Sequence, residues 1–142
     1  MDCAVYPLEE LKEYKYVVVL SLYKGKLLLS RHGERDTWET QGGHIEPGET
    51  PLEAAQRELY EESGALEFTL SPLCDYFAGD EVSHANGMVF VAEVTALGPL
   101  PQSEMAETAL FDQLPENLTY PCITPLLYRR WMEKETEKVT AV

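Results

Sequence analysis

The most informative stretch of the chain is residues 43–65, which read GHIEPGETPLEAAQRELYEESGA. Its first seven residues contain two glycines and a proline, which favour a loop over regular structure. Good helix formers follow, and Thr50 with Glu53 three residues later has the spacing of a capping box. Gly64 stands where many helices end in a left-handed residue. The stretch therefore predicts a glycine-containing loop followed by a helix over 50–63.

Three glutamates share one face of this predicted helix. Glu58, Glu61 and Glu62 stand at positions i, i+3 and i+4, and side chains at these spacings project from the same side. Like charges so placed cost an isolated helix about 0.2–0.5 kcal/mol per pair. A hard divalent cation would relieve that repulsion, and oxygen-only ligands favour Mg²⁺ or Mn²⁺ over Zn²⁺. The alternative is a solvated acidic helix face.

The rest of the helix has an expected role in packing and in charge pairing. Leu52, Ala55 and Leu59 are predicted to form its buried face. Arg57 is expected either to pair with Glu53 one turn earlier or to orient a neighbouring carboxylate. The helix is thus expected to place one face on the core and another beside a bound cation.

The spacing of the whole segment resembles a known family motif. Gly43, five residues, Glu49, seven residues, and then the run from Arg57 to Ala65 match the Nudix box at every defined position. The chain is therefore similar to the Nudix hydrolases, which cleave nucleoside diphosphates linked to another group. The resemblance implies the α/β class, with a Nudix-type α/β/α sandwich around a mixed β-sheet. It also implies a single Nudix hydrolase domain over 1–142.

This resemblance implies a role for the residues of the box. Glu58, Glu61 and Glu62 would bind the metal. The carbonyl oxygen of Gly43 would assist them, and Arg57 would orient the catalytic glutamates by ion pairing. Water would attack a phosphorus of the diphosphate while Mg²⁺ or Mn²⁺ stabilises the leaving oxyanion. Glu58 is the box residue best placed to activate that water.

Two further glutamates and one departure complete the comparison with the family. Glu49 is implied to hold the loop to the helix. Some members use a glutamate from a later loop as base, and Glu104, in the acidic segment 99–107, is the candidate here. The alternative for Glu104 is a solvated loop side chain. Many relatives have a proline before the paired glycines, whereas this chain has Gln41, which weakens any transfer of substrate preference.

Candidates for substrate binding lie mostly outside the box. Arg31 and Arg35 are candidates for contacts with substrate phosphates, because the chain contains few cations. His44 is another candidate, with a hydrogen bond inside the loop as the alternative. Trp38 is a candidate for stacking on a base. Further stacking candidates are Tyr76, Phe77 and Phe111, with a place in the core as the alternative for each.

Size and charge limit the classes of protein that need to be considered. A chain of 142 residues corresponds to one domain, at roughly 100–200 residues per domain. The 25 acidic residues outnumber 11 lysines and arginines, for a formal net charge of -14. A negative field repels nucleic-acid polymers and anionic membranes. We therefore expect a small phosphorylated substrate and neither of those partners; a homodimer stays open, since dimers are frequent among relatives.

The cysteines and the N-terminus indicate a cytoplasmic protein. Cys3, Cys74 and Cys122 are far apart and form no Cys-x-x-Cys pair, so we expect three reduced thiols. The first residues lack the features of a signal peptide. The longest aliphatic run, 17–20, is too short to cross a bilayer.

Outside the central segment, the pattern predicts strands and one more helix. Residues 16–23 and 26–30 flank a Lys-Gly pair and predict a hairpin. A second helix is expected from Thr124, with Leu127 and Trp131 on one face. Further strands are expected over 66–70, 73–77, 88–94 and 109–111, with a turn over 80–87.

The sequence thus predicts a metal-dependent hydrolase of a phosphoanhydride bond in a nucleoside diphosphate-X compound. A nucleoside triphosphate, plain or oxidised, giving the monophosphate and pyrophosphate, is the favoured substrate. The compact size favours it, as does segment 114–118, which resembles bacterial nucleotide-cleaning members. The alternatives are a sugar-nucleotide, a dinucleoside polyphosphate or a non-nucleotide diphosphate, and a Nudix module that binds a nucleotide without cleaving it. The intact box favours catalysis.

Overall fold

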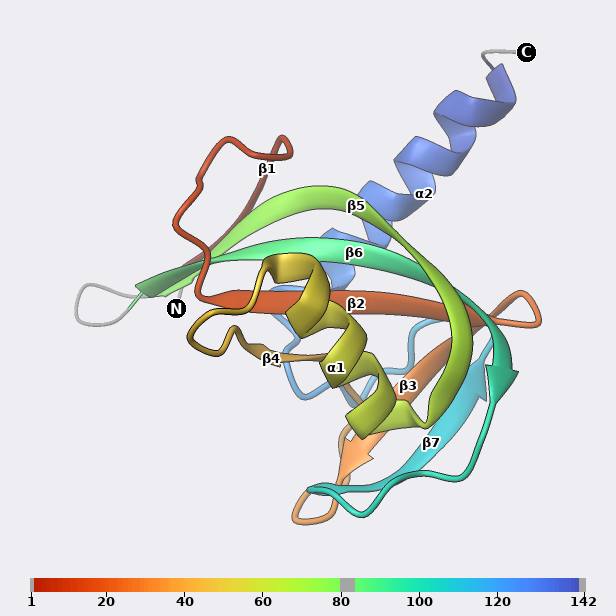
Figure 1. Cartoon of the computed structure of the whole chain (residues 1–142). Coiled ribbons are helices and arrows are strands. Elements are labelled where there is room, and N and C mark those ends of the chain that lie inside the picture. Colours follow the sequence, from red (N-terminus) through yellow and green to blue (C-terminus); the bar gives the residue numbers. More distant parts are fainter. Residues whose placement is uncertain (1, 80–83, 141–142) are drawn as a thin grey trace.

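The structure is a computed structural model that describes residues 2–79 and 84–140. Its elements in chain order are β1 (Asp2–Tyr6), β2 (Tyr16–Tyr23), β3 (Lys26–His32), β4 (Gln41–His44), α1 (Pro51–Ser63), β5 (Ala65–Gly79), β6 (His84–Leu97), β7 (Met105–Phe111) and α2 (Thr124–Thr140). The strands form one sheet in the order β1-β5-β6-β2-β3-β7, and β4 pairs with β2 (Figure 1). Strands β2 and β6 run parallel, whereas the other pairs are antiparallel. The predicted α/β fold with a mixed sheet is confirmed.

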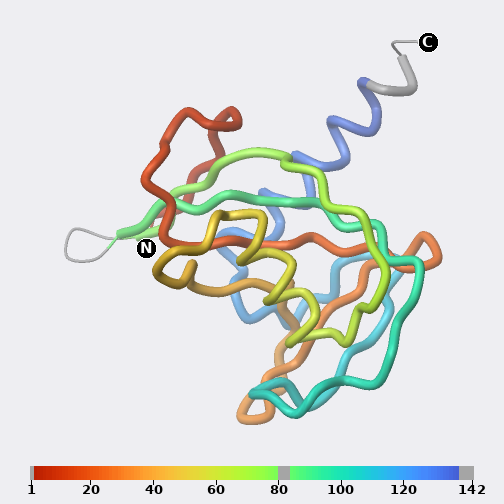
Figure 2. The backbone as a smooth tube through the Cα atoms, viewed as in Figure 1, coloured from red at the N-terminus to blue at the C-terminus, as the bar shows by residue number. Residues whose placement is uncertain are grey.

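The two helices lie on opposite faces of the sheet. Side chains along a strand alternate between the faces, and β2 shows this alternation clearly. Val17 and Val19 pack with the buried residues of α1. Tyr16 and Val18 pack in a second cluster with Leu127 of α2. The backbone trace shows the same three layers, with the second half of α2 extending away from the sheet (Figure 2).

Helix α1 begins and ends as the sequence predicts. Thr50 Oγ1 accepts a hydrogen bond from the amide of Glu53, and the Glu53 carboxylate accepts one from the amide of Thr50, which completes the capping box. Gly64 ends the helix with φ 81°, in the left-handed region where glycine is favoured. The helix bounds were therefore predictable from local chemistry.

The predicted buried face of α1 is correct in part. Ala55 and Leu59 are fully buried, but Leu52 is 44% exposed and the prediction for it is wrong. Leu52 lies in the first turn, and the buried positions of the helix begin only at Ala54. The sheet therefore covers the helix from its fourth residue onward.

Several predicted strands are confirmed, and two of them form one continuous strand in the structure. The hairpin of β2 and β3 is present, and Leu127 of α2 is buried as expected. The strands predicted over 66–70 and 73–77 form the single strand β5. Its register against β6 shifts between Pro72 and Cys74, so the break in the pattern marks an irregularity within one strand.

The ends of other strands differ from the prediction. The turn predicted over 80–87 is wrong in its last four residues, because β6 begins at His84. Residues 80–83 lie outside the described residues. Strand β7 begins at Met105, well before the predicted 109–111. Strand β1 was not predicted, since a short segment beside a proline carries little strand signal.

The expectation of three reduced thiols is wrong for two of them. Cys3 of β1 and Cys122, just before α2, form a disulfide, whereas Cys74 is free and buried. The pair is 119 residues apart in the sequence, and only the packing of α2 near β1 brings the two together. Spacing alone could not reveal that contact. Among the described residues, no helix is long and apolar enough to cross a membrane.

Candidate functional site

Glu62 is the most buried of the three box glutamates, and strand β4 holds it. Its Oε1 accepts a hydrogen bond from the amide of Gly42 at 2.8 Å. Burial is the largest cause that raises the pKa of Glu62 to about 8. The charges of Glu58, Glu39 and Glu104 act in the same direction, and the Gly42 hydrogen bond acts against them. A buried carboxylate surrounded by like charges is poorly compensated unless a cation is near.

Glu58 lies directly over Gly43 of the same strand. A Cβ atom built on Gly43 would lie 2.7 Å from Glu58 Oε1 and 2.8 Å from its carboxyl carbon. Only a glycine therefore leaves room for this carboxylate. Burial raises the pKa of Glu58, although hydrogen bonding to Arg57 acts in the opposite direction.

Arg57 connects the helix, the loop and β4. Its Nε and Nη2 donate to Glu49 at 2.7 and 3.0 Å, and its Nη1 donates to Glu58 at 2.7 Å. Nη2 also donates to the carbonyl of His44 at 3.1 Å. Of the two partners expected for this arginine, the structure shows neighbouring carboxylates. Glu53 is engaged in the capping box instead.

Glu49 fastens the loop to the helix. Its Oε1 accepts the amide of Glu46 at 2.8 Å in addition to the bonds from Arg57. The Arg57 hydrogen bonds, and then the Glu46 amide, lower the pKa of Glu49 to about 2. The loop before α1 is thereby tied at one point to the helix that carries the three glutamates.

The donor chemistry fits a divalent cation, although the side chains are engaged with one another. Within residues 2–79 and 84–140, no group of three acidic, histidine or cysteine side chains is arranged to hold a metal ion. Glu58 and Glu61 face Arg57, at 2.7 and 3.4 Å, and Glu62 faces Gly42. The oxygen donors nevertheless share one helix face, and no cationic side chain among residues 2–79 and 84–140 pairs with the half-buried Glu62. Nudix hydrolases generally use divalent metals.

Glu104 lies in the same electrostatic environment but points into solvent. Its side chain is 81% exposed, and its Oε2 is 3.6 Å from Nε2 of His32. Its charge contributes to the raised pKa of Glu62. The role of Glu104 as base or ligand stays a prediction.

Sequence reasoning missed two residues near these carboxylates. His32 ends β3, and its Nδ1 accepts the amide of Glu34 at 3.1 Å, which directs Nε2 toward Glu104. Glu39 is only 6% exposed and accepts hydrogen bonds from Arg35 and Thr119. An acidic residue beside a tryptophan gave no sign of burial.

The arginines proposed for phosphate binding are paired with other groups. Arg31 Nε lies 2.7 Å from Glu107, and its Nη1 donates to the carbonyl of Arg35 at 2.8 Å. Arg35 in turn pairs with Glu39 at 3.3 Å. A phosphate would have to compete with Glu107 for Arg31.

Among the other candidates, His44 belongs to the box and contacts Arg57, whereas the aromatic residues pack against other rings or in the core. The His44 ring lies 4.3 Å from that of Tyr16, and the carbonyl of His44 bonds to Arg57 as described above. Trp38 packs edge-on against Phe111, with ring centroids 5.1 Å apart. Tyr76 is buried in the cluster beneath α2, so the core alternative holds for it. Phe77 lies 5.6 Å from the ring of His84.

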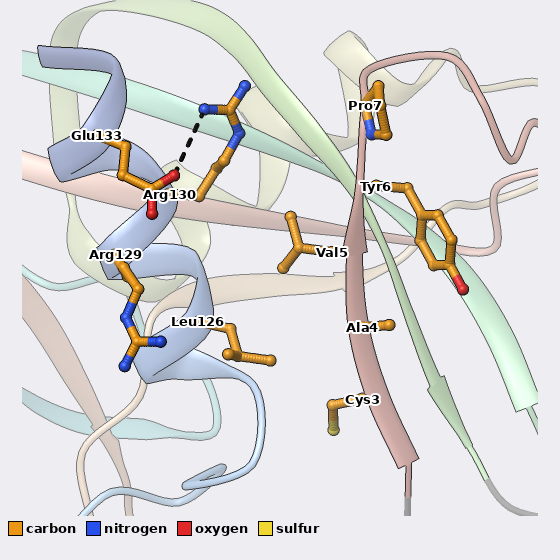
Figure 3. Close-up of a pocket in the computed structure, with 9 residues that line it drawn as sticks. All are labelled: Cys3, Ala4, Val5, Tyr6, Pro7, Leu126, Arg129, Arg130 and Glu133. Atoms are coloured by element: carbon orange, nitrogen blue, oxygen red, sulfur yellow. Dashed lines mark ion pairs between the residues drawn. The ribbon is translucent and has the colours of Figure 1, made fainter. Parts of the chain in front are cut away.

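A cavity of about 570 Å³ lies between β1 and α2, away from the glutamates (Figure 3). Its lining residues are Cys3, Ala4, Val5, Tyr6, Pro7, Leu126, Arg129, Arg130 and Glu133. Because α1 and α2 cover opposite faces of the sheet, this cavity is separate from the site on α1. We therefore place the candidate site at α1 and β4.

The fold and the site define an α/β/α protein whose first helix presents three glutamates over a glycine-containing strand. Residues 13–120 match the family model of the NUDIX domain. The chain belongs to the Nudix family. The predicted family is therefore confirmed, and the match includes the whole box.

Relatives with printed activities are hydrolases of diphosphate bonds. The chain is 36% identical over 108 residues to a Bacillus subtilis (strain 168) protein named "Putative 8-oxo-dGTP diphosphatase YtkD". This match covers 74% of this chain and 66% of that protein. It is 40% identical over 47 residues to an RNA pyrophosphohydrolase of Psychrobacter sp. (strain PRwf-1), covering 33% of this chain and 27% of that protein. These matches therefore span less than two thirds of both relatives.

A solved structure with the same fold covers nearly all of the chain. The crystal structure of a mutant of the Bacillus subtilis pyrophosphohydrolase BsRppH aligns with TM-score 0.79 and 26% identity, covering 93% of this chain and 90% of that one. The structure of a UDP-X diphosphatase aligns with TM-score 0.70 over 84% of this chain and 63% of that one, at 24% identity. The first of these proteins is a pyrophosphohydrolase by its printed name, and the second, at 24% identity, shows the shared fold alone.

Proposed function

We propose that this protein is a divalent-metal-dependent pyrophosphohydrolase that cleaves nucleoside triphosphates, plain or oxidised, to the monophosphate and pyrophosphate. The observation that carries the proposal is the arrangement of Glu58 and Glu62 against the paired glycines of β4, with Glu61 on the same helix face. The similarity to the protein named as an 8-oxo-dGTP diphosphatase supports the substrate class.

The residues that would hold Mg²⁺ or Mn²⁺ are Glu58, Glu61 and Glu62, with the carbonyl oxygen of Gly43. When bound, the cation supplies positive charge to phosphate oxygens and lowers the pKa of a bound water. Arg57 keeps Glu58 and Glu49 fixed relative to each other.

Glu58 is the proposed general base, accepting a proton from the attacking water on a carboxylate oxygen. Its pKa is raised by burial, and a base with a raised pKa retains a proton more readily during the reaction. Glu104 is the alternative base, because it is exposed and its charge acts on the same group of carboxylates. His44, Arg31 and Trp38 remain proposed substrate contacts.

A second candidate substrate is the 5′-triphosphate end of an RNA. The fold likeness to BsRppH favours it, whereas the net charge of -14 opposes extended contact with a polynucleotide. Recognition limited to the first nucleotides would need few phosphate contacts. The two candidate substrates therefore differ in how many nucleotides the protein would contact, one for a nucleoside triphosphate and more than one for an RNA end.

The test is hydrolysis of matched substrates in Mg²⁺ and then in Mn²⁺. The panel holds the common nucleoside triphosphates, oxidised nucleotides, a dinucleoside polyphosphate, a sugar-nucleotide, a non-nucleotide diphosphate and a short 5′-triphosphorylated RNA. Glu61→Gln is the inactive control, and Glu93→Gln is the matched control. Glu93 is an exposed residue of β6, and its neighbours Ala92 and Val94 pack with α1, so its side chain lies on the opposite face of the sheet. We expect the wild type to hydrolyse nucleoside triphosphates faster than the other substrates of the panel. This activity should be lost in Glu61→Gln and kept in the matched control.

Two other results would redirect the assignment. Preference for the RNA over its isolated first nucleotide would replace the mononucleotide with the RNA end. Metal and nucleotide binding without turnover of any substrate would leave a module that only binds nucleotides.

A further inference from the structure

A chain of buried hydrogen bonds runs from β2 to the last turn of α1. Ser21 Oγ donates to Gln41 Oε1 at 2.6 Å, and Gln41 Nε2 donates to Ser30 Oγ at 2.9 Å. Ser30 Oγ donates to the carbonyl oxygen of Glu62 at 2.8 Å. Both serines and the glutamine are fully buried, at 0% exposure. A polar chain in this position ends on a proposed metal ligand.

The direction of every bond in this chain is fixed. The second hydrogen of Gln41 Nε2 is donated to the carbonyl of Leu28 at 3.0 Å. A flipped amide would place its oxygen against that carbonyl and lose this bond. Ser30 must therefore accept from Gln41, which leaves its own hydrogen for Glu62. The bond to Glu62 is determined by the amide of Gln41.

Glu62 is consequently held at two points by adjacent residues of β4. The amide of Gly42 binds its carboxylate, and the side chain of Gln41 binds its backbone through Ser30. Carbonyls in the last turn of a helix lack an intrahelical partner, so Ser30 also satisfies a group that would otherwise be unpaired. The two contacts restrict both the backbone and the carboxylate of this glutamate.

We propose that Gln41 and Ser30 are positioning residues that set the direction of the Glu62 carboxylate for the divalent cation. The proposal rests on the proposed function. Loss of a partner behind a metal ligand typically lowers metal affinity about 10–100-fold.

The experiment measures Mn²⁺ binding by the loss of the free Mn²⁺ electron paramagnetic resonance signal, without substrate. Ser30→Ala removes the bond to Glu62. Ser21→Ala is the matched control, because it removes an equally buried hydroxyl from the same amide but leaves both donors of Gln41 in place. Ser30→Cys keeps a weak donor in nearly the same volume.

We expect the Kd for Mn²⁺ to rise about tenfold in Ser30→Ala, to rise less in Ser30→Cys, and to stay within about twofold in Ser21→Ala. Thermal unfolding should show a larger loss for Ser30→Ala, which removes two hydrogen bonds, than for Ser21→Ala, which removes one. Mn²⁺ binding is therefore compared at a temperature where every variant is folded, which separates positioning from a general loss of stability. If Ser30→Ala does not fold, Ser30→Cys carries the comparison with Ser21→Ala.

Failure of this inference can be told from failure of the proposed function. Equal Mn²⁺ affinities in Ser30→Ala, Ser21→Ala and the wild type, with normal hydrolysis by the wild type, would overturn the positioning role alone. A wild-type protein that neither binds Mn²⁺ nor hydrolyses any substrate would overturn the proposed function as well.

Discussion

Arg57 binds the carboxylate of Glu49 through two parallel hydrogen bonds, from Nε at 2.7 Å and from Nη2 at 3.0 Å. The third nitrogen of the same guanidinium binds Glu58 at 2.7 Å. A planar group with a rigid set of donors can make these bonds together, and a lysine cannot. The position of Glu58 therefore depends on an arginine specifically.

We expect Arg57→Lys to lower kcat/KM about 10–100-fold, because the carboxylates lose their shared anchor while the charge is kept. The measurement is steady-state hydrolysis of the preferred substrate. Arg129→Lys is the control, since Arg129 is exposed on α2. Activity of Arg57→Lys equal to that of Arg129→Lys would show that charge alone suffices.

The pKa of Glu49, lowered to about 2, predicts how the loop responds to acid. A carboxyl group with a lowered pKa in the folded state adds stability above its ordinary pKa of 4.5, and this is lost as the pH falls toward about 2. The melting temperature of Glu49→Gln should thus lie below that of the wild type at pH 7. The difference should shrink between pH 4.5 and 2. A difference independent of pH would contradict the assignment.

The close approach of Glu58 to Gly43 predicts that a methyl group added at position 43 lowers metal affinity. In Gly43→Ala the new Cβ would displace the Glu58 carboxylate, so we expect metal affinity to fall at least about tenfold. Gly33→Ala is the control, because its Cβ would meet its nearest neighbour at an ordinary 3.5 Å. Titration with Mn²⁺ would measure both, and equal affinities would exclude the displacement.

The sequence predicted what local chemistry determines. The capping box and Gly64 defined α1, and the spacing of the box identified the family and the glutamates. Partners brought together by the sheet were not predictable. The disulfide between Cys3 and Cys122 depends on β1 packing near α2, and the burial of Glu39 depends on Thr119, 80 residues later.

The disulfide predicts a measurable loss of stability on its removal. It links residues 119 apart, and closing a loop of this size is worth about 2–5 kcal/mol. The double variant of Cys3→Ser and Cys122→Ser should lower the free energy of unfolding by that amount in urea denaturation. A reductant should produce the same loss in the wild type and none in the variant. If the wild type and the double variant unfold with equal free energies in the absence of a reductant, the disulfide does not stabilise the protein.

The raised pKa of Glu62 predicts a link between pH, metal and stability. Its pKa is about 8 in the folded protein against an ordinary 4.5, so between these values the folded state binds more protons than the unfolded state. Stability of the metal-free protein should therefore fall as the pH rises from 4.5 to 8. Above pH 8 Glu62 is ionised in the folded protein, and without a bound cation the full loss of stability remains.

Glu62→Gln should remove that part of the pH dependence, because the amide keeps an oxygen for the Gly42 bond and carries no charge. Saturating Mg²⁺ should restore the stability of the wild type at high pH, by about 2.7 kcal/mol at 100 times its Kd, and should have little effect on the variant. The measurement is thermal unfolding from pH 5 to 9 with and without Mg²⁺, with Glu93→Gln as the control for charge. If the dependence of stability on pH is the same in Glu62→Gln as in the wild type, another carboxylate causes the loss of stability. Glu58, the next most buried of the three, would then be the group to replace.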